Sequence, residues 1–205
     1  ATLACLHHPN LVEVDEFDTS PTSGVPRFTL EFIGGRSIVD AVAHEGPDLL
    51  LDLAAEALRA LAFLHDFDLV HRDLKPGNLL VRDRPKLGCR LVLVDFGLAE
   101  PGTDETLEAY QAKGTLPYMA PELFRNERAS PRSDLYALGA VLFEAVHGRP
   151  PLALAGHDLG RFVVAATEGR RTRPPLPTGY PPGLDRWLDE MLAPDPASRP
   201  GRATG

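Results

Sequence analysis

The chain has 205 residues, of which 43% are hydrophobic and 24% charged, and its formal net charge is -8 at pH 7. This composition supports a single globular domain or most of a larger one. The acidic balance argues against nucleic acid or an anionic membrane as the main partner, because both favour basic surfaces. The two cysteines, Cys5 and Cys89, lie far apart without metal-ligand spacing, so we expect free thiols in a reducing compartment.

The N-terminal part of the chain is predicted to contain two strands. In residues 1–14, leucines surround a His-Pro-Asn turn, a pattern that predicts the end of a helix and then a strand that begins near Leu11. Residues 18–26 are polar and include Pro and Gly, so they predict a turn between strands. Residues 28–33 are mostly apolar and predict a second strand, which runs into two glycines.

A long helix and a hairpin are predicted next. Residues 48–65 follow a Gly-Pro pair, a favourable helix start, and carry Leu and Ala at helical spacing. This pattern predicts an amphipathic helix that packs on a core and leads to the loop that begins at His71. Two apolar runs, 79–81 and 91–94, then flank a polar turn with Pro and Gly, which predicts a β-hairpin.

The second half of the chain has one clear helix. Residues 133–147 carry an apolar face, with Ser133 as the predicted N-cap and Gly148 as the stop. A shorter helical patch is predicted around 184–192. The rest of this region is rich in Pro, Gly and Arg, and within it the basic run 170–173 is interpreted as a solvated loop rather than a docking patch.

Two short motifs flank the predicted hairpin. The loop before it reads HRDLKPGN, and Asp-Phe-Gly follows it. Phosphoryl transfer needs a carboxylate near the acceptor hydroxyl and oxygen ligands for Mg²⁺. Asp73 can supply the first, Asn78 and Asp95 the second, and Lys75 adds a cation where charge develops on the transferred group. Because a hairpin fixes its two flanking loops relative to each other, Asn78 and Asp95 can reach the same metals.

The ordered set of motifs resembles a serine/threonine protein kinase catalytic domain of the bacterial, eukaryotic-like type, over nearly the whole chain. The motifs are HRDLKPGN at 71–78, DFG at 95–97, GTLPYMAPE at 114–122, SDLY with LG at 133–139, and DP with RP at 195–200. The resemblance implies an α+β protein kinase-like fold. Residues 1–33 would be the remnant of the N-terminal lobe, with the end of helix C and strands 4 and 5. Residues 34–205 would be the helical C-terminal lobe, with the activation segment at 95–122.

The resemblance implies a role for each motif residue. Asp73 would orient the Ser or Thr hydroxyl and accept its proton, and Lys75 would stabilise the γ-phosphate of ATP. Asn78 and Asp95 would hold Mg²⁺. Thr115 would hydrogen-bond with Asp73 and Lys75, and a Lys two places after the catalytic Asp is typical of the serine/threonine branch.

The resemblance also assigns the nucleotide-binding linker. Backbone groups of Glu31 and Ile33 would hydrogen-bond the adenine of ATP, and Leu30 would be the gatekeeper. These assignments rest on position in the family pattern alone, because backbone recognition leaves no signature in residue type.

Three supporting contacts follow from the same resemblance. Asp134 would be buried and hold the backbone of the catalytic loop. Arg199 would form a buried ion pair with Glu122. In the family an arginine at the place of Arg72 can pair with a phosphate on the activation segment, for which Thr103, Thr106 and Tyr110 are the available acceptors. At each of these three positions an unmodified, solvent-facing residue is the favoured interpretation.

Parts of the family pattern are absent from the sequence. There is no Gly-rich loop, no Lys in a V-A-I-K context and no partner Glu for it, so we expect a piece of a longer kinase, truncated at both ends. A non-catalytic pseudokinase that acts as a scaffold is the first alternative. A kinase-fold phosphotransferase for small molecules is the second, and the segment 114–122 with Asp134 argues against it.

The expected cofactors are ATP and Mg²⁺, and the expected partners are protein substrates with Ser or Thr acceptors. We expect no nucleic-acid partner, and membrane attachment only through segments outside this chain. The kinase domain itself is expected to be cytoplasmic, whether or not the parent protein is anchored in a membrane.

Overall fold

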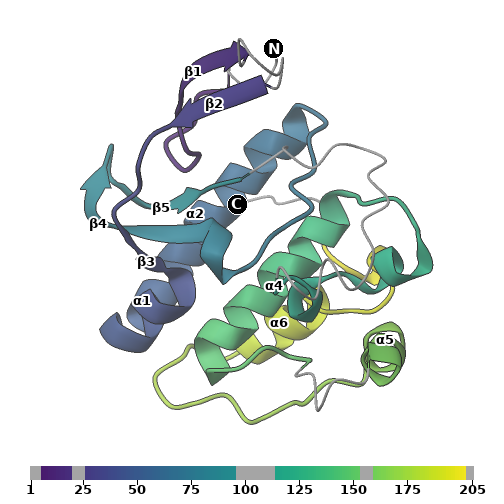
Figure 1. Ribbon diagram of the computed structural model, residues 1–205. Helices are drawn as coiled ribbons and strands as arrows, with labels where there is room; N and C mark the ends of the chain where they lie inside the picture. The colour runs from purple at the N-terminus through teal and green to yellow at the C-terminus, as the bar shows by residue number, and fades with distance from the viewer. Residues whose placement is uncertain (1–5, 20–25, 96–113, 153–158, 202–205) are drawn as a thin grey trace.

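The computed structural model describes residues 6–19, 26–95, 114–152 and 159–201 of the chain. A mainly helical body lies beside a three-stranded sheet, and a separate pair of strands lies at one side (Figure 1). In chain order the elements are β1 (Val14–Thr19), β2 (Pro26–Leu30), β3 (Gly35–Ser37), α1 (Ile38–Glu45), α2 (Asp48–Asp66), η2 (Pro76–Asn78), β4 (Leu79–Lys86), β5 (Cys89–Leu93), η3 (Leu116–Tyr118), η4 (Pro121–Arg125), α4 (Pro131–His147), α5 (Leu159–Thr167), α6 (Leu184–Met191) and η5 (Pro196–Ser198).

The predicted hairpin is confirmed and belongs to an antiparallel sheet with the order β3-β4-β5. Within it, Leu79 lies opposite Leu93 and Val81 lies opposite Leu91. All four side chains are buried in the main core, which stabilises the register because a one-residue slip would turn them to the other face. The catalytic loop, residues 71–78, leads into β4, and residue 95 follows β5, so the hairpin brings Asn78 and Asp95 to the same end of the sheet.

The two N-terminal strands differ in extent from the prediction. β1 and β2 pair antiparallel, but β1 begins at Val14 rather than near Leu11. Leu11 instead forms an isolated parallel bridge to Leu93, whose N–H donates to the Asn10 carbonyl at 2.8 Å. These contacts hold the stretch against β5. β2 ends at Leu30, because the following residues form the linker to β3.

The two longest predicted helices are confirmed as α2 and α4, although the predicted start of α4 is wrong. The helix begins at Pro131, and its N-cap is Ser130 rather than Ser133. Ser133 completes a capping box instead, because its Oγ accepts the N–H of Ser130 at 3.0 Å. Proline is favoured at the first helical position, where its missing N–H costs nothing. The predicted stop at Gly148 is confirmed by its left-handed backbone, with φ of 69°.

The other helices lie in regions of weaker sequence signal. The prediction for 184–192 is confirmed by α6, whereas α1 and α5 are not anticipated. α1 begins after Ser37, whose Oγ accepts the N–H of Asp40 at 3.1 Å and so caps the helix. α5 buries only Phe162 and Ala166, which belong to a second, smaller core with parts of η3.

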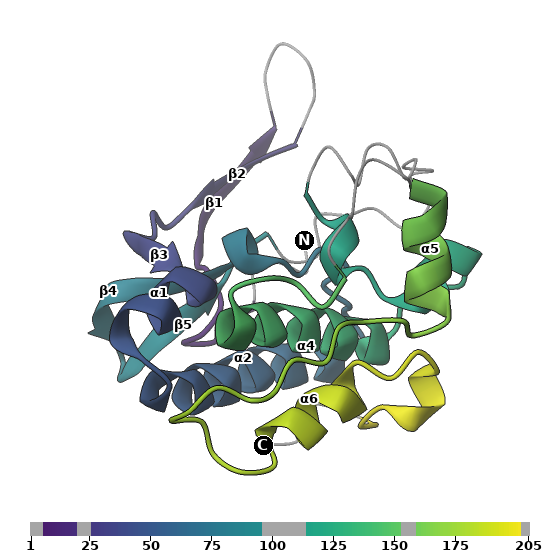
Figure 2. The same ribbon diagram turned by 90° about the horizontal axis from the view of Figure 1, so that it is seen from below.

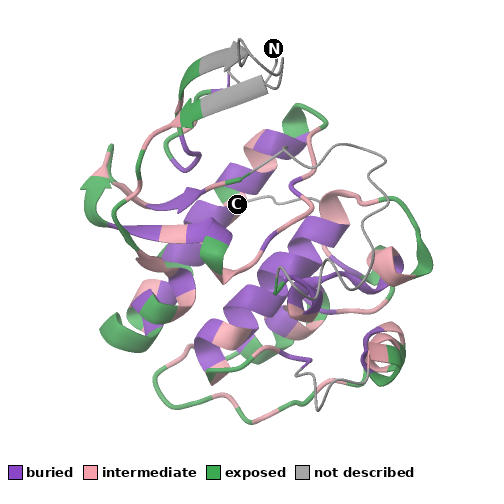
Figure 3. Ribbon diagram, in the orientation of Figure 1, coloured by how far each residue is buried: buried purple, intermediate pink, exposed green. Residues whose placement is uncertain are grey.

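α4 lies at the centre of the helical body. It packs against α1, α2 and α6, and Figure 2 shows α2 and α6 beside it. Most of its length is buried (Figure 3), because the elements around it cover it on several sides. Gly139 permits the close approach of α6, because a Cβ there would lie 2.8 Å from the Cβ of Met191. This packing fixes the first turn of α4, which carries Asp134.

Candidate active site

The backbone of the catalytic loop is anchored by Asp134 in the first turn of α4. Its carboxylate accepts the N–H of His71 at 2.8 Å and that of Arg72 at 3.0 Å, and contacts Nε2 of His65 at 2.9 Å. Asp134 is almost fully buried, so these bonds replace the water it loses. They also stabilise the left-handed backbone of Arg72, whose φ is 72°. The predicted anchoring role of Asp134 is thereby confirmed.

His71 connects the two functional loops. Its Nε2 lies 3.0 Å from the carbonyl of Val94, and since a carbonyl only accepts, Nε2 carries the hydrogen. Its Nδ1 then accepts the N–H of Asp73 at 3.3 Å. Burial lowers the pKa of His71 and outweighs the opposing charges of Asp134, Asp73 and Asp95. A neutral imidazole therefore holds residue 73 and residue 94 in fixed relation.

Asp73, Lys75 and Thr115 form the triangle that the resemblance implies. Nζ of Lys75 donates to Oδ2 of Asp73 at 2.8 Å, and Oγ1 of Thr115 donates to Oδ1 at 2.7 Å. Lys75 Nζ also lies 3.5 Å from Thr115 Oγ1. The side chain of Asp73 keeps 29% of its surface exposed. The site thus presents a carboxylate that is fixed in direction and still accessible to a hydroxyl group.

Asn78 and Asp95 are brought to the same end of the hairpin. Asn78 donates from Nδ2 to the Asp73 carbonyl at 2.7 Å, which leaves its Oδ1 as the atom available for a cation. The carbonyl of Asn78 accepts the N–H of Val94 at 3.0 Å, one residue before Asp95. Asp95 is exposed and has φ of 57°, a conformation that is strained for a non-glycine residue.

This donor set fits Mg²⁺, which takes oxygen ligands and usually receives only one or two of them from the protein. Within the described ranges, no cluster of three or more His, Cys, Asp or Glu could hold a metal by itself. Asn78 and Asp95 would therefore hold the ion together with phosphate oxygens and water. Their metal role stays a prediction.

The two residues predicted to bind adenine, Glu31 and Ile33, lie in the linker between β2 and β3, where the predicted lobe boundary also falls. Glu31 donates its N–H to the carbonyl of Glu13 at 3.0 Å, so only its carbonyl remains for an adenine. Leu30 and Ile33 pack against the main core, whereas Phe32 between them is 90% exposed. Adenine binding by Glu31 and Ile33 stays a prediction.

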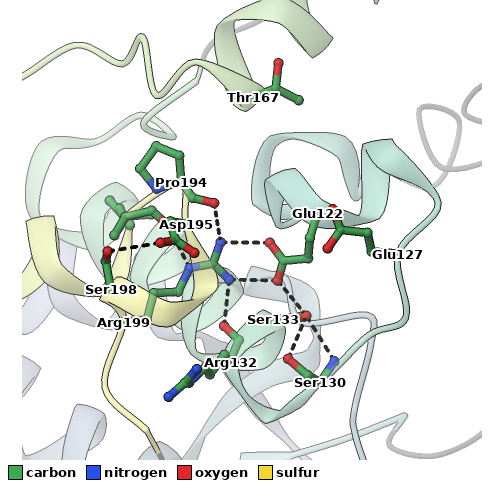
Figure 4. A network of polar contacts seen from close by, with 12 residues as sticks. Glu122, Glu127, Ser130, Arg132, Ser133, Thr167, Pro194, Asp195, Ser198 and Arg199 are labelled. Carbon is green, nitrogen blue, oxygen red and sulfur yellow. Dashed lines mark hydrogen bonds and ion pairs between the residues drawn. The ribbon is translucent and has the colours of Figure 1, made fainter.

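The predicted ion pair between Glu122 and Arg199 is confirmed and joins the end of the activation segment to the C-terminal region (Figure 4). The guanidinium donates to both carboxylate oxygens, each at 2.8 Å, and both side chains are buried. Oγ of Ser133 donates to Glu122 at 2.7 Å. Burial alone raises the pKa of Glu122, but the hydrogen bonds from Arg199 and Ser133 outweigh it and lower the pKa.

The interpretation of 170–173 as a solvated loop needs one correction. Arg170 and Arg173 are mostly exposed, but the side chain of Arg171 is buried. It donates to the carbonyl of Leu192 at 3.1 Å and pairs with Asp189. Arg171 therefore fastens this loop to α6, and the run offers less free charge than its sequence indicates.

Two buried polar residues of α2 that support the site region are not predicted from the sequence. His65 and Glu56 lie buried in α2, and Oε2 of Glu56 accepts from Asn10 Nδ2 and from the N–H groups of Arg90 and Leu91. A polar residue on the buried side of an amphipathic helix is the signal that could have found both. Residues 1–5, where the predicted helix end begins, and the candidate acceptors Thr103, Thr106 and Tyr110 lie outside the described residues.

Comparisons with known proteins agree with this geometry. The family described as "Protein kinase domain" matches residues 1–204. Serine/threonine-protein kinase PknA of Mycobacterium tuberculosis (strain ATCC 25618 / H37Rv) is 33% identical over 205 residues, which cover 97% of this chain and 46% of that protein. Serine/threonine-protein kinase PknB of Mycobacterium leprae (strain TN) is 30% identical over 208 residues, which cover 96% and 32%.

A solved structure gives the same result for the fold. The crystal structure of Rad53 1-466 in complex with AMP-PNP matches with a TM-score of 0.74 and 25% identity, over 98% of this chain and 50% of that one. The chain thus spans about half the length of PknA or of that Rad53 chain, and about a third of PknB. Since the family match runs through the catalytic loop, the linker and the buried ion pair described above, this chain belongs to the protein kinase family.

Proposed function

We propose that the protein containing this chain transfers the γ-phosphate of ATP to Ser or Thr hydroxyl groups of other proteins. The observation that carries the proposal is the triangle of Asp73, Lys75 and Thr115, which is assembled beside Asn78. A scaffold that only binds partners has no need for a fixed and accessible carboxylate at this place. The relatives named above support Ser and Thr as acceptors, and AMP-PNP in the Rad53 structure supports an adenine nucleotide.

In the proposed mechanism, each residue acts from the position it already occupies. Thr115 and Lys75 hold the Asp73 carboxylate in one orientation, so an incoming hydroxyl meets an acceptor for its proton. As the hydroxyl oxygen bonds to phosphorus and the bond to the ADP oxygen breaks, Lys75 stabilises the charge on the transferred group. Asn78 and Asp95 would hold Mg²⁺, which when bound would neutralise negative charge on the phosphates.

We also propose a location and a class of partner for the kinase domain. The proposed use of ATP and Mg²⁺ favours a cytoplasmic domain, and the net charge of -8 favours protein partners over nucleic acid. None of the described helices is long and apolar enough to cross a membrane. We propose that any membrane attachment comes from segments outside this chain.

The test is an Asp73→Asn variant of the natural protein, assayed for transfer from Mg²⁺-ATP to a Ser- and Thr-containing protein substrate. Loss of the carboxylate should reduce the rate by about 10²–10⁴-fold. Asp52→Asn, which changes an exposed carboxylate on α2, is the matched control and should leave the rate unchanged. A wild-type protein that binds nucleotide but transfers no phosphate would overturn the proposal in favour of a scaffold.

The metal role has a separate test. Asp95→Ala should abolish transfer and weaken the Mg²⁺-dependent part of nucleotide binding, because one of two oxygen ligands is removed. Unchanged transfer in this variant would exclude Asp95 from the metal site.

A further inference from the structure

We propose that Arg82 is a positioning residue for nucleotide binding, because its guanidinium holds Glu31 and so sets where the backbone of the linker meets the adenine ring. The linker is defined here as residues 31–34, between the end of β2 at Leu30 and the start of β3 at Gly35. The inference rests on the proposed function only in taking the linker as the adenine site. It concerns a residue of β4 that is remote in sequence from the linker and outside all the motifs.

The side-chain contact is bidentate. Arg82 donates from its two terminal nitrogens to Oε1 and Oε2 of Glu31, each at 2.8 Å. The Arg82 side chain is only 10% exposed and that of Glu31 22%, so water competes little with the pair. Parallel charge-assisted hydrogen bonds of this kind fix direction as well as distance. The carboxylate of Glu31 therefore cannot turn without breaking two bonds.

A second cation extends the contact. Nζ of Lys86 lies 3.2 Å from Oε1 of Glu31 and 3.0 Å from Oε2 of Glu13. Hydrogen bonds from Arg82 and Lys86 lower the pKa of Glu31 despite its partial burial, so it stays charged at neutral pH. The N–H of Glu31 also donates to the carbonyl of Glu13. The first residue of the linker is thus fixed through both its side chain and its backbone.

The other end of the linker lies beside the same residue of β4, Arg82. Gly35 pairs with Arg82 in the β3–β4 ladder, and the N–H of Asp83 donates to the carbonyl of Gly34 at 3.3 Å. The approach is so close that a Cβ on Gly35 would lie 2.1 Å from the carbonyl oxygen of Val81. β4 therefore holds one end of the linker through its backbone beside Arg82 and the other end through the side chain of Arg82.

The position of the linker determines how its backbone groups meet the adenine ring. Between the fixed ends, the Glu31 carbonyl and the Ile33 N–H are the groups assigned to adenine, and a hydrogen bond weakens steeply with misalignment. Releasing the Glu31 side chain would let the linker move relative to β4, and the bonds to the base would lose their register. The groups that hold phosphate and acceptor, Asn78 and Asp73, do not contact Arg82 in any described interaction and would keep their geometry.

The test compares Arg82→Met with wild type in the natural protein, with Kd measured for non-hydrolysable analogues of ATP and of GTP. We expect Kd for the ATP analogue to rise roughly five- to tenfold, as for the loss of one charge-assisted interaction, and the preference for adenine over guanine to fall. Arg82→Lys keeps the charge without the fork and should give an intermediate rise. Arg84→Met changes an exposed residue of the same strand and should behave as wild type.

Kinetics add a second readout. Arg82→Met should raise KM for ATP by the same factor while kcat and KM for the protein substrate change less than about twofold, because the catalytic triangle is untouched. Unchanged Kd and unchanged base preference would overturn the inference, even if the variant is less stable, since Arg82 would then only support the fold. If the wild type binds the analogue but transfers no phosphate from Mg²⁺-ATP, the proposed function fails while the Kd comparison still decides the role of Arg82.

Discussion

Replacing Arg199 with methionine removes a cation whose side chain is fully buried. The guanidinium donates to both oxygens of Glu122 and also to the carbonyls of Ala193, Pro194 and Arg132, at 2.7 to 3.1 Å. Methionine fills a similar volume but can donate none of these bonds. The Glu122 carboxylate would keep the hydroxyl of Ser133 but lose both bonds from its cationic partner, in a place that water does not reach.

The magnitude follows from this geometry. Removing one partner of a buried ion pair leaves the other charge uncompensated and costs about 3–5 kcal/mol of unfolding free energy. For a domain of this length each kcal/mol moves Tm by about 2–4 °C, so we expect Tm of the kinase domain to fall by roughly 6–20 °C. Removing Glu122 as well, in Glu122→Met with Arg199→Met, should restore part of the loss because neither charge of this pair is then left in the interior.

The assay is thermal unfolding of the natural protein, with the transition of the kinase domain followed in wild type and in each variant. Arg186→Met is the matched control, since it breaks an exposed pair with Glu190 on α6 and should cost no more than about 0.5 kcal/mol. A fall in Tm for Arg199→Met as small as that of Arg186→Met would refute the reasoning, because the carboxylate of Glu122 would then not need its partner.

Three further predictions concern the loops around the site. Burial lowers the pKa of His71, so as pH drops below about 6.5 the unfolded chain protonates this imidazole before the folded chain does. The free energy of unfolding therefore falls by up to about 1.4 kcal/mol per pH unit. The loss of Tm on acidification should therefore be smaller in His71→Gln, and equal losses would contradict this. Gly35→Ala places a Cβ against the carbonyl of Val81 and should cost about 1–3 kcal/mol in thermal unfolding, whereas Gly34→Ala has room for it and should not. Asp134→Asn replaces one of the two accepting oxygens with an NH₂ donor, which faces a backbone N–H, so Tm and kcat should both fall, and unchanged values would rule out its anchoring role.

The parts of the fold that were predictable from sequence are those with a local cause. α2 repeats apolar residues over a length that no strand reaches, and the hairpin has two apolar runs around a Pro- and Gly-containing turn. The start of α4 shows the limit of such signals. Ser130 and Ser133 are both good N-caps, and the choice depends on Pro131, which is favoured at the first helical position.

The contacts of the site divide in the same way. Those of Asp134, Thr115 and Arg199 lie in motifs, so the resemblance alone implied them before any geometry was known. Two other contacts join residues that are far apart in sequence. One is the ion pair of Glu31 with Arg82, and the other is the hydrogen bond that the hydroxyl of Tyr118 donates to Glu144 at 2.5 Å. No periodicity or motif links such residues, and only the folded chain brings them together.

The most direct test of the account is transfer of phosphate from Mg²⁺-ATP to a protein substrate by the natural protein, with the modified amino acids identified afterwards. The account predicts phosphoserine or phosphothreonine in the wild-type reaction and a loss of about 10²–10⁴-fold in Asp73→Asn at unchanged Tm. Phosphotransfer that survives Asp73→Asn, or a wild type that binds the nucleotide and modifies no Ser or Thr, would contradict it.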